Sequence, residues 1–145
     1  MGDQFHQPRK ILVISRDNIG DLVCTTPLLA ALRARFPDAW ISVLANSYNA
    51  PVLSGNPYFY DVFFYTKCKH VASAQSQRLA QWKALWQRLR LIANLRRRRI
   101  DEVILPGGEQ ASARRFARWI APRRVLVASP ATTGHEVERS MACLA

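Results

Sequence analysis

The sequence predicts an α/β fold in which helices pack on both faces of a parallel sheet. Short aliphatic and β-branched runs alternate along the chain with segments whose apolar residues recur at helical spacing. The first of these runs, at 10–15, contains the uninterrupted apolar stretch ILVI, which is typical of a strand buried on both faces. This alternation with short connections favours a parallel sheet, and crossovers between parallel strands are expected to be right-handed.

The first half of the chain supplies strands and helices in alternation. Their predicted order is a strand at 10–15, a helix at 21–36, a strand at 40–45, a short helix at 47–53 and a strand at 61–66. Pro37 and Asp38 end the first helix, and the sequence Gly55-Asn56-Pro57 breaks the chain before the third strand.

The second half begins with the longest helix, predicted over 74–98. Its apolar residues recur three and four positions apart and predict a single buried stripe, with a charged stripe opposite. The apolar positions are Leu79, Trp82, Leu85, Trp86, Leu89, Ile92 and Leu95, and the charged ones are Arg78, Lys83, Arg88 and Arg90. Trp82 and Trp86 are therefore interpreted as core residues rather than as a platform for a sugar. A strand at 100–105, a helix at 110–120 and a strand at 125–128 complete the sheet.

The last segment begins a further helix. Thr133 and Glu136 have the spacing of a capping box, and apolar residues follow on one face. The pattern reaches Ala145 without a stop signal, which predicts that a second domain follows. The predicted organisation is a polar tail at 1–9, an α/β domain at 10–130 and the start of an interdomain helix at 131–145.

Charge is the clearest compositional signal. The 145 residues carry a formal net charge of +11, and the stretch 78–124 holds 13 of the 21 cations with 3 acids. Such asymmetry indicates an anionic partner, which could be nucleic acid, an anionic membrane or a phosphorylated ligand. Arginine outnumbers lysine 17 to 4, which favours bidentate contacts, although codon usage gives the same bias.

Several classes of protein are excluded. The three cysteines are too few and too scattered for a disulfide framework, and they form no CxxC pair for zinc. No apolar run approaches the roughly 18 residues that a membrane span requires.

A candidate site lies in the loop after the first strand. Ligands of parallel sheets bind at the carboxyl ends of the strands, where the loops starting at Arg16, Lys67 and Pro106 are expected to meet. The first loop lacks both the GxGxxG and the GxxxxGK[ST] phosphate motifs. It offers Gly20, whose backbone can take unusual angles, followed by Asp21 at a helix start, where the dipole favours the charged carboxylate. On these residues alone, an ordinary N-cap aspartate is the simpler interpretation.

The wider pattern resembles glycosyltransferase family 9, the lipopolysaccharide heptosyltransferases of Gram-negative bacteria. The resemblance starts with KILVISRDNIGDLVCTTPLL at 10–29 and continues with FPDA at 36–39. Further agreement comes from GNP at 55–57, IDEVI at 100–104 and HEVER at 135–139. The combined pattern IGD-x3-TTP-x8-FPDA is specific, whereas a lone Gly-Asp pair would not be.

The resemblance implies a GT-B enzyme with two Rossmann-like domains facing a cleft. The N-terminal half holds the acceptor, and the C-terminal half holds a nucleotide sugar, typically ADP-heptose. Transfer inverts the anomeric centre, and no metal or other cofactor is required. This chain would be the N-terminal acceptor half, truncated and inactive alone, with the donor domain absent.

The resemblance also assigns site residues. Asp21 matches the general base, the group that takes the proton from an acceptor hydroxyl. The expected acceptor-binding residues are Asn18, Gly20, Lys67, Lys69 and His70. For the last three, a solvated loop is the alternative. The acceptor would be Kdo-lipid A or the heptosylated core, which places the protein in the cytoplasm, peripherally on the inner membrane, with no nucleic-acid partner.

A different class of function also fits the charge. The chain could be a peripheral domain that binds an anionic membrane or another polyanion without catalysis. The run Arg96–Arg99 lies at the far end of the predicted sheet, so it is a poor acceptor clamp but a fair contact for anionic lipid. A merely solvated helix end is the alternative for that run.

Overall fold

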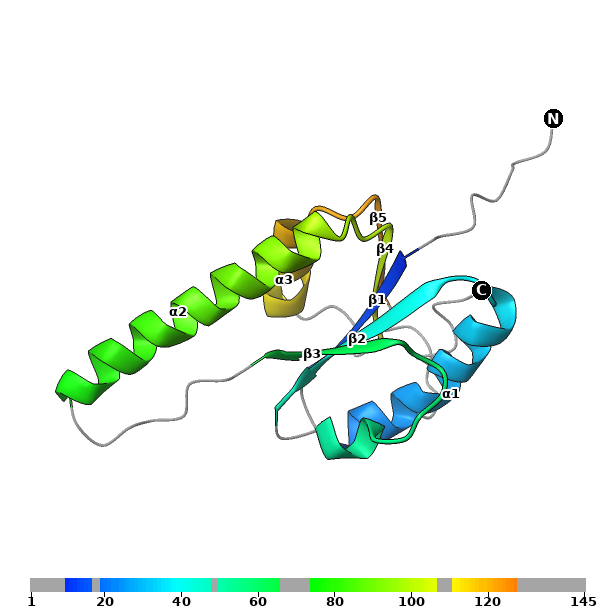
Figure 1. The fold of residues 1–145 in the computed structure, drawn as a ribbon, viewed down its shortest axis with the longest axis horizontal. Coiled ribbons are helices and arrows are strands. Elements are labelled where there is room, and N and C mark those ends of the chain that lie inside the picture. Colours follow the sequence, from blue (N-terminus) through cyan, green and yellow to red (C-terminus); the bar gives the residue numbers. More distant parts are fainter. Residues whose placement is uncertain (1–9, 17–18, 48–49, 66–73, 107–110, 128–145) are drawn as a thin grey trace.

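A computed structural model describes residues 10–16, 19–47, 50–65, 74–106 and 111–127. Within these residues, parallel strands form one sheet in the order β3-β2-β1-β4-β5, with β1 at its centre (Figure 1). The strands are β1 (Lys10–Ser15), β2 (Trp40–Asn46), β3 (Asp61–Tyr65), β4 (Glu102–Leu105) and β5 (Arg124–Val127). The predicted α/β fold is confirmed, and this strand order is that of a Rossmann-like sheet.

Helices cover both faces of the sheet, as predicted (Figure 1). On one face lie α1 (Ile19–Arg35) and the short 3-10 helix η1 (Ala50–Leu53), and on the other lie α2 (Ala74–Arg97) and α3 (Ala111–Ile120). Predicted boundaries agree with these to within a few residues. The helix predicted from Thr133 lies outside the described residues.

The strand β1 is buried on both faces, which is why its sequence predicts its place in the sheet. Ile11, Leu12 and Val13 have no exposed surface. Because successive side chains of a strand point to opposite faces, Ile11 and Val13 pack beneath α1, whereas Leu12 packs beneath α2 and α3. A central strand covered on both sides must be apolar at every interior position, which is the pattern observed.

The prediction that α2 buries its apolar stripe is wrong for most of the helix. Ile92 and Leu95 are buried, but Trp82 and Trp86 are exposed, together with Leu79, Leu85 and Leu89. Length is one reason, because a 24-residue helix is about 36 Å long, whereas the five-residue β3 spans about 17 Å. The early turns of α2 project beyond the sheet (Figure 1).

The amino ends of the strands form the opposite edge of the sheet. Asp101 accepts a hydrogen bond from the Lys10 backbone N–H at 3.1 Å, and its backbone N–H donates to the Lys10 carbonyl at 3.0 Å. Arg96 and Arg99 line a hollow at this edge together with Lys10 and Arg123. The arginine run therefore lies far from the carboxyl ends, as predicted.

Glu102, at the start of β4, makes the stability depend on pH. Burial raises the pKa of its carboxyl, and the Arg124 guanidinium, 3.7 Å away but mostly exposed, opposes this only in part. The pKa of Glu102 is higher in the folded state than in the unfolded state. Between about pH 4.5 and the raised pKa, the folded state therefore binds more protons than the unfolded state does. The free energy of unfolding should therefore fall as the pH rises through that window.

Glu102→Gln should remove this contribution and flatten the pH dependence of stability in the weakly acidic range. Urea unfolding at a series of pH values, compared with wild type, measures the effect. Asp38→Asn, which removes an exposed carboxylate, is the control. Equal pH slopes for wild type and Glu102→Gln would contradict the prediction.

Candidate functional site

The topology places a site between β1 and β4. From β1 the chain proceeds to β2 on one side, and it later returns to β4 on the other. As a result α1, which follows β1, and α3, which follows β4, leave toward opposite faces of the sheet. Ligands of such sheets bind in the crevice that this divergence opens at the carboxyl ends of the strands.

Asp21 lies in the first turn of α1, at this edge. The helix begins at Ile19, so Asp21 is its third residue and the interpretation as an N-cap is wrong. The side chain is half-buried. Thr25, fully buried one turn later, donates from Oγ1 to the Asp21 carbonyl oxygen at 2.7 Å. The place of Asp21 in the first turn puts its carboxylate at the positive end of the helix dipole.

Gly20 precedes Asp21 within the same turn. It is helical and does not take the left-handed conformation, so the expected use of an unusual backbone angle is not observed. A Cβ added at Gly20 would meet no described atom within 4 Å other than those of its chain neighbours and of its own helix backbone. Glycine costs a helix up to about 1 kcal/mol relative to alanine. The space where that Cβ would lie is open in the described part of the chain.

Arg16 connects β1 to α3 across the same crevice. Its side chain directly follows the buried strand and is 8% exposed. Nη2 donates to the Ser112 hydroxyl at 3.1 Å. The guanidinium also lies over the rings of Tyr65, at 5.0 Å from the centroid, and Phe116, at 5.7 Å. Hydrogen bonding and cation–π contacts together hold this buried cation in one orientation.

Further arginines converge on the same place. Arg88 of α2 lies 5.0 Å from the Tyr65 ring centroid, so two guanidinium groups share one aromatic ring. The sequence placed Arg88 on the solvent side of α2, but it is half-buried on the side facing the sheet. The surrounding hollow has a volume of about 210 Å³. We call it the arginine pocket, and its lining is Arg16, Tyr65, Arg88, Ser112, Arg115, Phe116 and Trp119.

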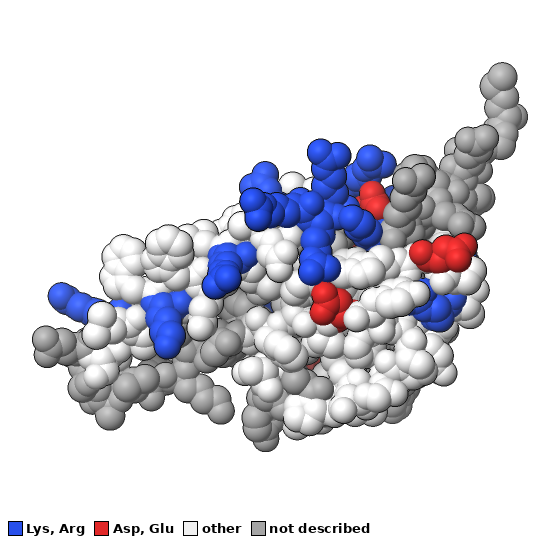
Figure 2. All heavy atoms as spheres, in the orientation of Figure 1, with Lys and Arg blue, Asp and Glu red and all other residues white. Residues whose placement is uncertain are grey.

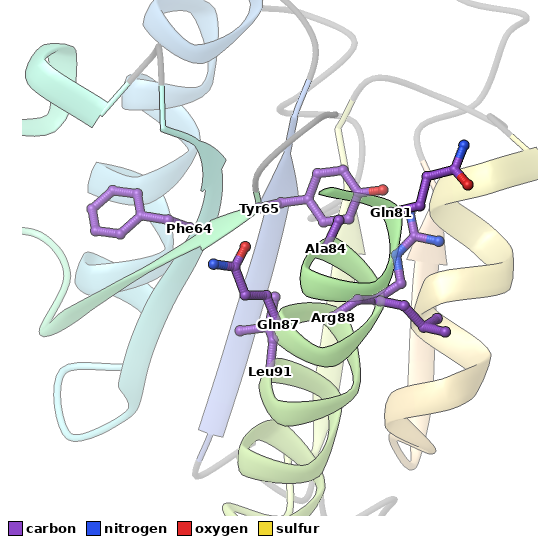
Figure 3. A pocket seen from close by; sticks show the side chains of 8 residues that line it. Phe64, Tyr65, Gln81, Ala84, Gln87, Arg88 and Leu91 are labelled. Atoms are coloured by element: carbon purple, nitrogen blue, oxygen red, sulfur yellow. The ribbon is translucent and has the colours of Figure 1, made fainter. Parts of the chain in front are cut away.

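A second hollow adjoins the arginine pocket. It has a volume of about 360 Å³ and lies between the end of β3 and α2. Figure 3 shows Tyr65 turned toward α2 and Arg88 rising from that helix, with Gln81 above them and Phe64 pointing the other way. Tyr65 and Arg88 line both hollows, so together these form a continuous basic and aromatic surface at the carboxyl end of β3.

The structure brings together only part of the predicted site. Gly20 and Asp21 lie side by side at the expected edge of the sheet. The other predicted acceptor residues, Asn18, Lys67, Lys69 and His70, lie outside the described residues. In the part of the chain that is described, no three His, Cys, Asp or Glu side chains gather in a way that could hold a metal ion.

The arginine pocket was missed by sequence reasoning. Arg16 carried a usable signal, because a charged residue that directly follows a buried parallel strand stands at the ligand-binding edge. Tyr65 ends the third strand in the same way. Nothing local in the sequence indicated that Ser112 and Arg115, in a later helix, would meet them.

Comparisons with known proteins come from solved structures. No protein-family model matches the chain, and no curated protein does. The fold is nevertheless that of a Rossmann-like domain found in glycosyltransferases of family 9. A family 9 glycosyltransferase from Veillonella parvula matches with a TM-score of 0.70 and 16% identity, over 94% of this chain and 40% of its own.

Two Escherichia coli enzymes match in the same way. Heptosyltransferase WaaC, solved with ADP, has a TM-score of 0.69 and 18% identity, over 90% of this chain and 45% of its own. ADP-heptose lipopolysaccharide heptosyltransferase II has a TM-score of 0.67 and 22% identity, over 94% of this chain and 40% of its own. The chain thus spans less than half the length of these proteins, and its fold matches that portion of them.

Proposed function

We propose that this chain is the acceptor-binding half of an inverting GT-B glycosyltransferase. The reaction would be transfer of heptose from ADP-heptose to the inner core of lipopolysaccharide. The observation that carries the proposal is the placement of Asp21, in the first turn of the helix that follows β1 at the carboxyl edge of the sheet, in a fold shared with heptosyltransferase structures. The resemblance of the IGD and TTP motifs supports the same assignment.

The proposed chemistry needs one carboxylate. Asp21 accepts the proton of an acceptor hydroxyl while the hydroxyl oxygen attacks the anomeric carbon of the donor. The bond from that carbon to the diphosphate oxygen breaks, the nucleoside diphosphate leaves with the electron pair, and the configuration inverts. Gly20 leaves room for the acceptor to approach the carboxylate. The donor would be held by a further domain.

The arginine pocket suits an acidic acceptor. A Kdo carboxylate or a core phosphate carries negative charge, and guanidinium groups pair with both in bidentate geometry. Arg16 is already oriented by Ser112 and two aromatic rings, so little side-chain entropy is lost on binding. Asn18, Lys67, Lys69 and His70 would complete the acceptor site, and the lipid-linked acceptor would place the protein on the cytoplasmic face of the inner membrane.

Binding of an acceptor by the 145-residue chain tests the proposal. Calorimetry with a short-acyl Kdo-containing lipid A should give saturable binding that survives moderate salt. Heparin and duplex DNA at the same two salt concentrations are the polyanion controls. Equal binding to all three ligands, lost together when salt is raised, would show a generic polyanion surface and defeat the acceptor assignment.

Gly20→Ala separates folding from function. The new methyl group meets no described side chain within 4 Å, so the variant should fold with equal or higher thermal stability, up to about 1 kcal/mol for the helix. The same methyl group would enter the space proposed for the acceptor and weaken its binding. Thermal unfolding and acceptor calorimetry measure the two effects.

The matched control is Ala30→Gly, in the middle of α1. It should lower stability without changing acceptor affinity. If Gly20→Ala binds the acceptor as wild type does, the space beside Asp21 is not part of the acceptor site.

A further inference from the structure

The outer face of α2 is an exposed apolar surface. It consists of Leu79, Trp82, Trp86 and Leu89, with Leu85 at its edge, where this side chain also lines the hollow between β3 and α2. Trp82 is 64% exposed and Trp86 is 69% exposed, although tryptophan is normally among the more buried side chains. These residues are consecutive members of one helical stripe, so they form one patch. A contiguous patch of this kind marks an interaction site more often than scattered surface residues do.

This patch is distinct from the side of α2 that covers the sheet. Leu91, Ile92 and Leu95 belong to the core between the sheet, α2 and α3. At 100° per residue, Trp82, Trp86 and Leu89 lie about half a turn around the helix from Leu91 and Leu95, and Ile92 lies between the two groups, about 60° from Leu89. The helix is thus apolar over a wide arc, and the core uses only the part of it that contains Leu91, Ile92 and Leu95.

The charges around the patch have one sign. Arg78, Lys83 and Arg90 lie along its borders, and Arg96 and Arg97 continue the helix beyond it. The 24 residues of α2 contain no Asp or Glu. Figure 2 shows Lys and Arg side chains spaced along α2 and gathered near its C-terminal end. A partner for this surface must therefore accept apolar side chains and carry negative charge.

We propose that the outer face of α2 binds the surface of an anionic lipid bilayer. The helix would lie in the plane of the head groups, with its Leu side chains among the upper acyl chains. Its Trp side chains would lie at the interface, where the amphipathic indole ring is favoured, and its cations would meet the lipid phosphates. No helix among the described residues is long and apolar enough to cross a bilayer.

A second copy of the chain fits this face less well. Two α2 helices packed by their outer faces would bring Arg78, Lys83 and Arg90 of one copy close to the same cations of the other. Such like-charge contacts oppose association, whereas anionic phospholipids attract each of these cations. The charge pattern therefore favours a membrane over a dimer.

Vesicle flotation of the full chain tests this. The vesicles contain phosphatidylethanolamine and phosphatidylglycerol, with phosphatidylcholine vesicles as the uncharged comparison. The double variant Trp82→Gln/Trp86→Gln should lower partitioning onto anionic vesicles about tenfold or more. The control is Tyr60→Gln, which removes an aromatic side chain that is 68% exposed but lies outside α2. It should bind as wild type does.

The charge requirement has its own variant. Lys83→Gln/Arg90→Gln should lower binding to anionic vesicles about fivefold per cation at low salt, with little change on phosphatidylcholine. Circular dichroism and thermal unfolding should show that all three variants keep the fold, because the substituted side chains are exposed.

Two results would overturn the proposal. One is unchanged vesicle binding in Trp82→Gln/Trp86→Gln. The other is a dimer of the wild-type chain without lipid, seen by analytical ultracentrifugation, that is lost in Trp82→Gln/Trp86→Gln, together with no binding of wild type to vesicles. The proposal complements the proposed transferase but does not depend on it. Asp21→Asn should leave vesicle binding unchanged, so failure of one proposal is distinguishable from failure of the other.

Discussion

Asp21→Asn is expected to lower the rate of sugar transfer by about 10²–10⁴-fold, the usual contribution of a general base. Asparagine keeps the size of the side chain and its place in the first turn of α1, but its amide cannot accept a proton from the acceptor hydroxyl. Acceptor affinity should stay close to that of wild type, because the change does not touch Arg16 or the rest of the arginine pocket.

The measurement requires the donor-binding half as well. Transfer of heptose from ADP-heptose would be followed with this chain fused to the donor-binding portion of a heptosyltransferase, while acceptor binding is measured by calorimetry. The control is Asp17→Asn, which removes another carboxylate of the same loop. A larger loss of transfer rate with Asp17→Asn than with Asp21→Asn would identify Asp17 as the general base. Full activity of Asp21→Asn would exclude Asp21 as the general base.

Arg16→Met is expected to weaken binding of the acidic acceptor by about 30-fold or more, as when one partner of a buried charge pair is removed. Methionine retains the apolar contacts with Tyr65 and Phe116, so the domain should still fold. What disappears is the guanidinium that Ser112 and the two rings hold in place.

Calorimetry with an acidic acceptor and with a neutral analogue identifies the cause. Affinity for the acidic ligand should fall steeply, while affinity for the neutral one changes little. The control is Arg118→Met, which removes the same charge from an exposed position on α3. Equal losses in both variants would mean that net charge, and not the arginine pocket, governs binding.

The sheet and the order of its elements could be predicted because strong local signals agreed with the global fold. The apolar run of β1 and the breaks at Pro37 and Gly55 each have one simple structural meaning. The stripe of α2 was misassigned because a helical pattern identifies an apolar face but does not say what covers it. Helix length compared with strand length would have been the better guide.

The candidate site could be predicted only where it is contiguous in sequence. Gly20 and Asp21 follow the first strand directly, and the motif resemblance singled them out. The arginine pocket joins Arg16 to Ser112, 96 positions later. That contact depends on how β4 and α3 return beside β1, which no local pattern encodes. The burial of Arg88 depends in the same way on the rotation of α2 about its axis.

The central position of β1 has a consequence for synthesis of the protein. β1 leaves the ribosome first, yet one of its two neighbours, β4, comes about 90 residues later, as the pairing of Ile11 with Glu102 shows. Until then one edge of the most apolar strand has no partner. Pairing over such a separation is slow, and an uncovered apolar edge favours aggregation. Nascent chains that stop before residue 102 should therefore depend on chaperones, whereas chains that extend past β5 should not.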